Sequence, residues 1–567
     1  MEKYKSGEAL IEILNAHGVD NVFINPGFEF LEVMSSVASA RVEGSKSPQL
    51  VLCLDESVAA SAAYGNYMIS GKPQVVMVHS ELGTLQLGGN LQNLQWGRVP
   101  VVILAAYQEI DVQRTLWNGQ PFDQGSIVRN SVKYDRRLEG DEDLHEVLAE
   151  AFRIACTEPT GPVYIYFPMN YLYNEIEKPA VISVSAETGT LPAVDMDVLE
   201  KMADILLEAK NPLLVSGNAG RHHENVKALT SLAETLGASA LTGYSWMNFP
   251  NTHPLCLGIE QLGGSRKMDV CYEDADVILV IDYSMPYVGS ASPPKPDTKI
   301  LHIDIDPFTQ GRLLWGRGAD IFMKADAREA IPALERMLKD KIAAEKKSEL
   351  DERFQRIAAA NTETRLGWYV SAREQSNLEL ISSDYLCYCI NQVIDEDVIV
   401  VNHTLGSCVS VTEQIERTKP GTWFGCPSGA IGWAPGAALG AASASPGKTI
   451  VAIMTDGGFV WGCPTSTFWT ATNYRFPFLA VICNNKGYGA VRNALLARMG
   501  EDSRGEKFIS ESAYEFSPDY ALIAQGAGAF GRTLIKPGDV LPALRDALDA
   551  VRNGKPAVLD VHLPYEM

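Results

Sequence analysis

A carboxylate, two glycines and an amide follow neighbouring apolar runs in the last third of the chain. Thr455-Asp456-Gly457-Gly458 comes directly after the run at residues 449–454, and Asn484-Asn485 follows a second run at 478–483. Ligands of open parallel sheets lie at the carboxyl ends of the strands, so Asp456 and Asn485, 29 residues apart, are expected to converge on one crevice. Glycines let the backbone approach a diphosphate, and carboxylate and amide oxygens suit a hard divalent cation. The alternative is an ordinary strand-to-helix turn capped by Asp456, with unrelated asparagines.

Three other segments place polar or small residues where expected strands end. Leu54-Asp55-Glu56-Ser57 closes the apolar run at 50–54 and precedes a small-residue helix. Glutamate is a common proton-transfer group, although a strand-end glutamate taken alone is more often simply exposed. Gly429-Ala430-Ile431-Gly432-Trp433 precedes a second small-residue helix that runs through Gly440, and Gly406-Ser407 follows the expected strand at 397–401.

Taken in order, these motifs resemble those of thiamine-diphosphate enzymes of the acetolactate synthase and benzoylformate decarboxylase superfamily. Asn25-Pro26-Gly27, Glu56, the His-Ile-Asp-Ile-Asp-Pro segment at 302–307 and the C-terminal signature occur in the family's order over essentially the whole chain. The signature usually begins Gly-Asp-Gly, and Thr455 replaces its first glycine here.

The resemblance implies bound thiamine diphosphate and Mg²⁺ and gives each motif a role. Glu56 would hydrogen-bond the aminopyrimidine ring and favour the tautomer that removes the C2 proton of the thiazolium. Asp456 and Asn485 would bind Mg²⁺ through their side chains and Gly487 through its carbonyl, while Ile431 would hold the cofactor in a bent shape. The other expected cofactor contacts are Pro26, Gly27, Gly406, Ser407, Gly429, Gly457, Gly458 and Tyr488.

His79 is a candidate catalytic proton carrier. It lies in the segment at 78–84, which resembles a His-Ser-Ala-Ala-Gly-Thr stretch of benzoylformate decarboxylase more than the Gly-Pro-Gly stretch of acetolactate synthases. An ordinary histidine pKa of ~6.5 suits proton transfer at neutral pH. The alternative is a strand-end histidine whose ring is satisfied by the backbone.

Other positions depart from both relatives and leave the substrate open. Phe28 stands where the decarboxylase has a substrate-contacting serine, and the loop at 283–293 supplies no second histidine. The loop after Ile281 lacks the flavin-contacting arginine of acetolactate synthases, so FAD is not expected. Candidate substrate contacts are Phe28, Gln120 and Trp461. The polar segment at 495–512 is a candidate lid, or else a plain surface loop.

Three series of short apolar runs separated by helix-length segments must position these motifs. Such runs predict an α/β fold with three doubly wound parallel-sheet domains, at 1–176, 190–340 and 375–567. The resemblance assigns them to pyrimidine binding, a middle domain, and diphosphate and Mg²⁺ binding. The expected strands are 21–24, 50–54, 74–79 and 100–106; 212–216, 277–281 and 299–305; and 397–401, 449–454, 478–483 and 557–562.

The net charge and the residues near Met1 argue against two classes of partner, nucleic acids and membranes. The formal net charge of −22 argues against a nucleic-acid partner, because such binding relies on clustered Lys and Arg. No long apolar run or leader pattern stands near Met1, so we expect a cytoplasmic protein without a membrane partner. Its partners would be a small 2-oxo acid and a carbonyl acceptor.

The expected activity is that of a carboligase or lyase. By resemblance, the cofactor's C2 carbanion would attack a 2-oxo acid or an α-hydroxy ketone, and a second carbonyl compound would capture the resulting enamine. A simple 2-oxo acid decarboxylase and a non-catalytic cofactor-binding paralogue are the alternatives. Because the family binds its cofactor between the first domain of one subunit and the third of another, at least a homodimer is expected, with a tetramer left open.

Overall fold

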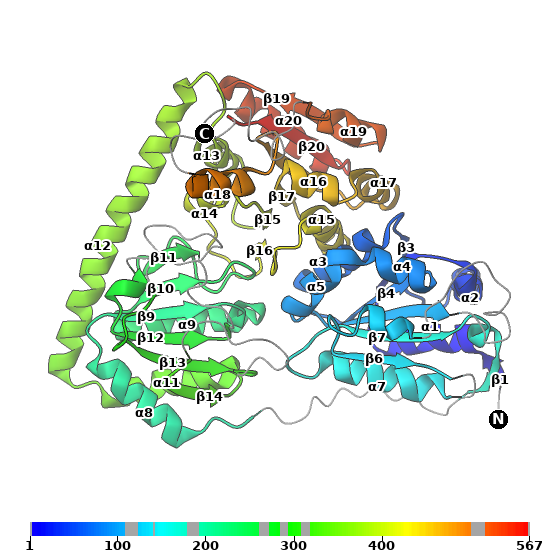
Figure 1. The fold of residues 1–567 in the computed structure, drawn as a ribbon, viewed down its shortest axis with the longest axis horizontal. Coiled ribbons are helices and arrows are strands. Elements are labelled where there is room, and N and C mark those ends of the chain that lie inside the picture. Colours follow the sequence, from blue (N-terminus) through cyan, green and yellow to red (C-terminus); the bar gives the residue numbers. More distant parts are fainter. Residues whose placement is uncertain are drawn as a thin grey trace.

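The computed structural model contains three six-stranded sheets with helices on both faces (Figure 1). It describes residues 3–107, 123–139, 142–178, 192–259, 271–283, 293–307, 318–499 and 516–564. Within each of these sheets every neighbouring pair of strands is parallel. The prediction of three doubly wound parallel sheets is therefore confirmed.

The N-terminal sheet has the strand order β3-β2-β4-β5-β7-β6. Its central strands are apolar and buried, as strands covered on both faces must be. The strands are β2 (Asn21–Asn25), β3 (Gln49–Leu52), β4 (Gln74–Val78), β5 (Val101–Tyr107), β6 (Tyr134–Arg137) and β7 (Val163–Pro168). The helices are α1 (Ser6–Ala16), α2 (Leu31–Glu43), α3 (Glu56–Ser70), α4 (Ser80–Gln86), α5 (Gly88–Trp96) and α7 (Leu144–Cys156). A short antiparallel pair, β1 (Lys3–Lys5) and β8 (Glu175–Glu177), lies beside this sheet.

The middle sheet has a different order, β11-β10-β9-β12-β13-β14. This is the order of dinucleotide-binding doubly wound folds. Its strands are β9 (Pro212–Ser216), β10 (Ser239–Thr242), β11 (Cys256–Ile259), β12 (Val277–Ile281), β13 (Lys299–Asp304) and β14 (Ile321–Lys324). Its helices are α8 (Met196–Glu208), α9 (His223–Leu236) and α11 (Ala327–Lys341).

The C-terminal sheet repeats the order of the N-terminal one, as β16-β15-β17-β18-β20-β19. Its strands are β15 (Ile399–His403), β16 (Trp423–Gly425), β17 (Ile450–Thr455), β18 (Leu479–Asn484), β19 (Phe530–Leu534) and β20 (Ala557–His562). The helices are α13 (Ser383–Val393), α14 (Cys408–Gln414), α15 (Trp433–Ala444), α16 (Asp456–Trp461), α17 (Pro464–Tyr474), α18 (Gly489–Met499), α19 (Tyr520–Gly526) and α20 (Val540–Arg552). The strand predicted at 397–401 lies two residues later, because the Asp395 carboxylate accepts the backbone N–H groups of Asp397 and Val398 in a turn.

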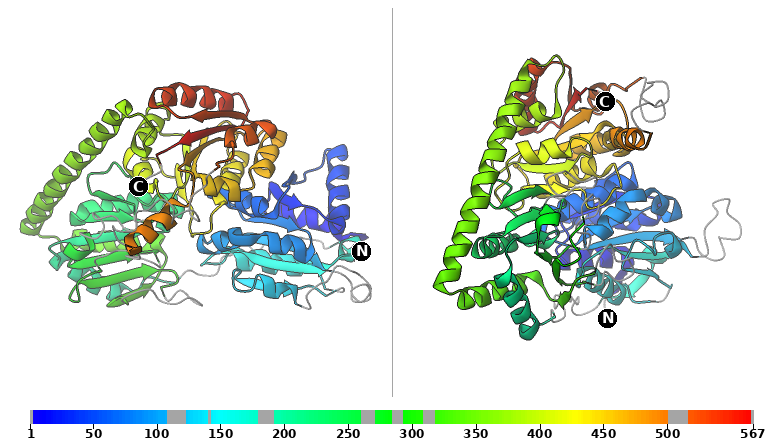
Figure 2. Two further views of the ribbon diagram at one scale, coloured as in Figure 1. Left: turned by 45° about the horizontal axis from the view of Figure 1, so that its top comes forward. Right: turned by 60° about the vertical axis from the view of Figure 1, so that its left-hand side comes forward.

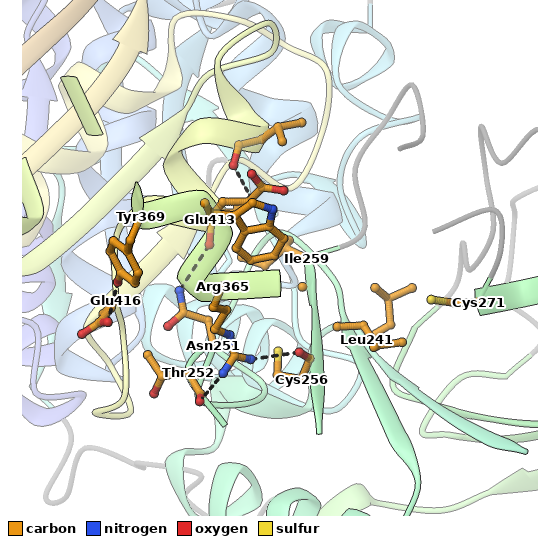
Figure 3. Close-up of a pocket in the computed structure, with 15 residues that line it drawn as sticks. Leu241, Asn251, Thr252, Cys256, Ile259, Cys271, Arg365, Tyr369, Glu413 and Glu416 are labelled. Atoms are coloured by element: carbon orange, nitrogen blue, oxygen red, sulfur yellow. Dashed lines mark hydrogen bonds between the residues drawn. The ribbon is translucent and has the colours of Figure 1, made fainter. Parts of the chain in front are cut away.

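A long helix, α12 (Ala344–Glu374), runs along one side of the molecule from the middle to the C-terminal domain (Figures 1 and 2). The Arg365 guanidinium on this helix donates to the carbonyls of three residues of the middle domain, Thr252, His253 and Cys256. Tyr369, one turn later, donates to the Glu416 carboxylate of the C-terminal domain. Residues of α12, of α14 in the C-terminal domain and of the middle domain line a pocket of about 50 Å³, shown in Figure 3. The helix thus fixes the two domains to each other.

Two small-residue helices, α3 and α15, pack together where the N-terminal and C-terminal domains meet (Figure 1). A Cβ atom on Gly65 would lie 1.9 Å from the Ala437 carbonyl oxygen, and one on Gly440 would lie 1.8 Å from that of Ala62. Glycine is required at these contacts because the backbones approach too closely for any side chain. Across the part of the chain that the structure describes, none of the helices combines the length and the apolar character that a membrane span needs.

Candidate active site

Glu56 lies where the N-terminal sheet gives way to α3, as its first residue rather than at the end of a strand. The Asp55 carboxylate caps this helix by accepting the Ser57 N–H at 2.8 Å. Glu56 is only 6% exposed, so the interpretation as an exposed glutamate is wrong. Burial raises the pKa of its carboxyl, and a hydrogen bond with Asn25 opposes that rise. The structure therefore holds a carboxyl that keeps its proton more readily than an ordinary glutamate.

His79 follows β4 and approaches the same place from the neighbouring strand end. Its Nδ1 lies 2.9 and 3.0 Å from the two carboxylate oxygens of Glu29, so the ring is held by a side chain and not by the backbone. The hydrogen bond to Glu29 raises the pKa of His79, and the nearby Glu56 carboxylate acts in the same direction. Asn25, Gly27, Glu56 and His79 therefore form one cluster, with Pro26 in the loop between Asn25 and Gly27.

A second cluster lies at the carboxyl ends of β17 and β18. Asp456 is buried, and its two carboxylate oxygens accept the backbone N–H groups of Gly457 at 2.7 Å and Gly487 at 3.0 Å. Thr455 Oγ1 accepts the Gly458 N–H at 3.1 Å and so caps α16. The residue that replaces the signature's first glycine thus stabilises the turn that presents Asp456.

The oxygen atoms of this second cluster fit a hard cation. Burial raises the pKa of Asp456 to about 6. Among the described residues, Asn485 Oδ1 is buried and has no hydrogen-bond partner. Gly487 adopts φ 157°, a conformation available to glycine, beside the Asp456 carboxylate. One carboxylate, one unpaired amide oxygen and a nearby carbonyl are ligands that Mg²⁺ accepts while keeping water or phosphate oxygens.

The segments before α14 and α15 leave open space for a ligand. A Cβ atom on Gly406 or Gly429 would meet nothing within 4 Å. Ser407 is mostly buried at the start of α14, with its Oγ 3.0 Å from Ser383 Oγ. These positions fit a bound diphosphate or pyrimidine, whose approach a side chain would obstruct.

His403, at the end of β15, was not predicted from the sequence as a site residue. It is buried, both of its ring nitrogens lack a hydrogen-bond partner among the described residues, and burial lowers its pKa to about 4. A buried polar group without a partner is costly, so His403 is a candidate ligand contact three residues before Gly406. The signal in the sequence was a histidine at the end of an apolar strand, where ligands of such sheets bind.

The candidate apolar contacts lie mostly on the C-terminal side. Trp461 Nε1 donates to Tyr488 Oη at 3.4 Å. The loop that carries Ile431 reaches this pair, because a Cβ atom on Gly432 would lie 2.6 Å from the Trp461 carbonyl oxygen. Phe28 is 77% exposed in the N-terminal domain. Gln120 and residues 500–512 of the candidate lid lie outside the described residues.

The two clusters do not share hydrogen bonds among the described residues. Those of Glu56 and His79 stay within the N-terminal domain, and those of Asp456 stay within the C-terminal domain. The two domains approach each other beside the clusters, where Ser57 Oγ lies 3.8 Å from Cys463 Sγ. One chain therefore presents a cluster of titratable side chains in its N-terminal domain and a cluster of buried oxygen atoms in its C-terminal domain.

Solved structures confirm the fold. The chain superposes on the thiamine diphosphate-dependent 4-hydroxybenzoylformate decarboxylase of Rhodococcus jostii RHA1 with a TM-score of 0.81 and 21% identity, over 99% of this chain and 100% of that one. The benzoylformate decarboxylase of Polynucleobacter necessarius gives a TM-score of 0.81 and 17% identity, over 99% of both chains.

Curated relatives match over the full length. The chain is 26% identical to the sulfoacetaldehyde acetyltransferase of Castellaniella defragrans, over 100% of this chain and 94% of that protein. It is 24% identical to the acetolactate synthase large subunit of Corynebacterium glutamicum, over 99% of this chain and 87% of that protein.

Family models account for each of the three domains. Those of the thiamine pyrophosphate (thiamine diphosphate) enzymes match the N-terminal TPP binding domain at residues 4–127, the central domain at 199–334 and the C-terminal TPP binding domain at 404–561. The chain therefore belongs to the thiamine pyrophosphate enzyme family and is a thiamine-diphosphate-dependent enzyme.

Proposed function

We propose that this enzyme forms or cleaves a carbon–carbon bond next to a carbonyl group, with a 2-oxo acid or an α-hydroxy ketone as donor and a second carbonyl compound as acceptor. When bound, thiamine diphosphate supplies the nucleophilic carbon and the electron sink that such chemistry requires. The observation that carries the proposal is the division of the chain into a proton-transfer cluster and an oxygen-ligand cluster.

The C-terminal cluster would bind the charged part of the cofactor. Asp456, Asn485 and the Gly487 carbonyl would hold Mg²⁺, which in turn neutralises a diphosphate. Gly406, Ser407 and His403 line the adjoining strand end, where His403 would donate a hydrogen bond to a diphosphate oxygen. Gly457 and Gly458 would keep the backbone near the same group.

The N-terminal cluster would bind the pyrimidine part. Glu56 would hold a proton toward the ring, which its raised pKa favours. Ile431 would pack against the cofactor, and the Gly429 carbonyl would accept a hydrogen bond from the cofactor's amine. Pro26 and Gly27 lie in the turn beside Glu56 and would contact the same end of the cofactor.

We also propose that the working unit is at least a homodimer, with the N-terminal cluster of one subunit facing the C-terminal cluster of the other. The lack of hydrogen bonds between the two clusters in the described part of one chain supports this arrangement, and so do the exposed apolar side chains beside each of them. Phe28 is 77% exposed next to the first cluster and Trp461 is 60% exposed next to the second. Apolar residues at a site also exclude water, which favours capture by a second carbonyl compound over protonation.

A simple decarboxylase is the second candidate, and the His79–Glu29 pair favours it. A histidine with a raised pKa beside the reacting carbon would return a proton to that carbon, and an aldehyde would be released. The two candidates differ in the fate of the same donor, so one product analysis separates them.

The deciding experiment is mass spectrometry of products from the purified protein with Mg²⁺ and thiamine diphosphate. Pyruvate, benzoylformate, larger 2-oxo acids and sulfoacetaldehyde would be supplied singly and with aldehydes. Cofactor-dependent hydroxy ketones or acyl-transfer products are the expected result. If every donor yields only an aldehyde, the protein is a decarboxylase and not a carboligase. If no donor yields a product, the protein is a non-catalytic cofactor-binding paralogue.

A further inference from the structure

A buried glutamate that the sequence motifs did not single out holds the candidate proton carrier. Glu29 lies in the short 3-10 helix Phe28–Phe30, and its side chain is 0% exposed. Its two carboxylate oxygens lie 2.9 and 3.0 Å from His79 Nδ1, whereas the His79 side chain is 35% exposed. A carboxylate that is fully removed from water needs a charged or donating partner, and His79 is the partner in this structure.

The local backbone accommodates this pair. A Cβ atom on Gly27 would lie 2.1 Å from His79 Nδ1 and 2.3 Å from Glu29 Oε2, so only glycine allows the two side chains to meet above it. Ser80 directly after His79 has φ 39°, which costs a non-glycine residue conformational energy. Strained residues cluster at functional sites because the surrounding structure holds a side chain in one direction.

We propose that Glu29 is the positioning residue of His79, and that it fixes Nδ1 so that a proton on Nε2 faces the substrate carbonyl. This inference rests on the proposed function. With Nδ1–H donating to Glu29, Nε2 is the ring nitrogen left to donate a proton to a carbonyl oxygen. The Nε2–H bond would break as the O–H bond forms, the imidazolium would become a neutral imidazole, and Glu29 would stay a carboxylate throughout.

The charges around His79 support the protonated ring. Carboxylates act on it from three elements: Glu29 from the 3-10 helix, Glu56 from α3 and Glu81 from α4. The hydrogen bond that His79 Nδ1–H donates to the Glu29 carboxylate is the largest cause of the raised His79 pKa, and burial opposes it. Removing only the charge of Glu29 should therefore lower the pKa of His79, while the packing of residue 29 against the His79 ring stays nearly unchanged.

The first test measures the pair without any cofactor. The wild-type protein with ¹⁵N-labelled histidine would be titrated by NMR, with His79 assigned from the His79→Gln variant. We expect a His79 pKa above that of free histidine in the wild type and a lower one in Glu29→Gln. The matched control is Glu32→Gln, which removes a carboxylate of α2 that pairs with Lys5 at 3.0 Å. An ordinary wild-type pKa, or an equal shift in the Glu32 control, would overturn the proposal.

The second test uses the enzyme with its cofactor. Glu29→Gln should lower kcat by roughly 10²-fold with little change in KM, the size expected for a general acid that loses its orientation and charge. The limb of the pH–rate profile on which protonated His79 is lost should move to lower pH. Combining Glu29→Gln with His79→Gln should add almost nothing, because both act through one proton. Additive losses, or an unmoved limb, would make Glu29 merely structural.

The two tests also separate this proposal from the proposed function. If the His79 pKa depends on Glu29 but the protein converts no donor, the positioning role of Glu29 stands and the carboligase function is rejected. If the enzyme is active but the His79 pKa does not change when Glu29 is replaced, only the positioning role of Glu29 is rejected.

Discussion

The N-terminal and C-terminal sheets share one strand order, and different residue types stand at their equivalent strand ends. After β2 and its counterpart β15 come turns that contain Gly27 and Gly406. The ends of β4 and β17 lead into His79 and Asp456. Beyond β3 and β16 the chain reaches Glu56 and Ile431, each close to the start of one of the two packed helices, α3 and α15. Topology sets where these candidate groups lie, and residue type sets which chemistry each of them is suited to.

The environments at these strand ends differ as the residues do. Two titratable groups of the N-terminal domain, Glu56 and His79, both have a raised pKa, the first through burial and the second through Glu29. In the C-terminal domain, burial keeps His403 neutral by lowering its pKa to about 4. The C-terminal domain thus pairs a neutral His403 with Asp456, whose pKa burial raises to about 6, whereas both groups of the N-terminal cluster gain affinity for a proton.

The largest expected effect comes from removing the candidate proton-transfer group of the N-terminal cluster. Glu56→Gln should lower kcat/KM by ~10³-fold, within the range of lost general acid–base catalysis, while thiamine diphosphate affinity changes little. Steady-state rates and cofactor titration by tryptophan fluorescence would measure the two effects. If the variant keeps activity within tenfold of wild type, the N-terminal cluster does not transfer the essential proton.

The same substitution should change stability with a defined sign. Burial raises the folded-state pKa of Glu56, so ionisation costs stability above that pKa and costs nothing below the unfolded-state pKa. Glu56→Gln should therefore raise the free energy of unfolding of the cofactor-free protein at neutral pH, with the gain vanishing toward acid pH. Urea unfolding between acid and neutral pH measures the change in the free energy of unfolding. Glu32→Gln, which removes another buried carboxylate, is the matched control.

The next effect should fall on binding rather than on proton transfer. Asp456→Ala removes the carboxylate that accepts two backbone N–H groups and that would bind Mg²⁺. Cofactor affinity in the presence of Mg²⁺ should fall by ~10²-fold, the upper end seen when metal-site groups are removed. Isothermal titration measures it, and Asp549→Ala, an exposed change on α20, is the control. Unchanged affinity would show that the C-terminal cluster does not bind the charged end of the cofactor.

Apolar periodicity predicted most of the central strands and the edge strand β3, but it missed the interior strands β7 and β10 and the other sheet edges. The predicted strands at 212–216, 277–281 and 557–562 match β9, β12 and β20, which are buried almost throughout. The edge strand β6 reads Tyr-Asp-Arg-Arg and is nowhere fully buried. Such a strand carries little apolar signal because only one of its sides lies against a neighbour.

Candidate site residues could be predicted where they stand in a sequence motif. Those whose burial depends on the folded structure were missed. Asp456, Asn485 and Glu56 stand in recognisable segments. Glu29 was missed because its burial, and its contact with a residue 50 positions away, exist only once β2 and β4 pair. The helix cap at Thr455 had a readable signal, a threonine before a short helix, that the comparison with Gly-Asp-Gly obscured.

The contact between α3 and α15 joins the two domains and should tolerate no added side chain. Gly65→Ala places a methyl group against the Ala437 carbonyl oxygen, so we expect a loss of about 2 kcal/mol of unfolding free energy from overpacking. Gly367→Ala is the matched control in α12, where a Cβ would meet nothing within 4 Å and should stabilise by roughly 0.5–1 kcal/mol. Urea denaturation measures both. Equal effects of the two changes would contradict the tight contact between the helices.

The smallest expected effect tests whether His403 binds the cofactor as a neutral ring. His403→Leu keeps an apolar side chain of similar reach in the buried position but removes both ring nitrogens, so cofactor affinity should fall about tenfold, the worth of one good hydrogen bond to a charged group. Because burial lowers the His403 pKa to about 4, this loss should be the same at every pH from neutral down to that value. Titration calorimetry over that range measures it. A loss that grows or shrinks between pH ~6 and ~8 would mean that His403 titrates like a free histidine, and the two domains would then share their proton chemistry.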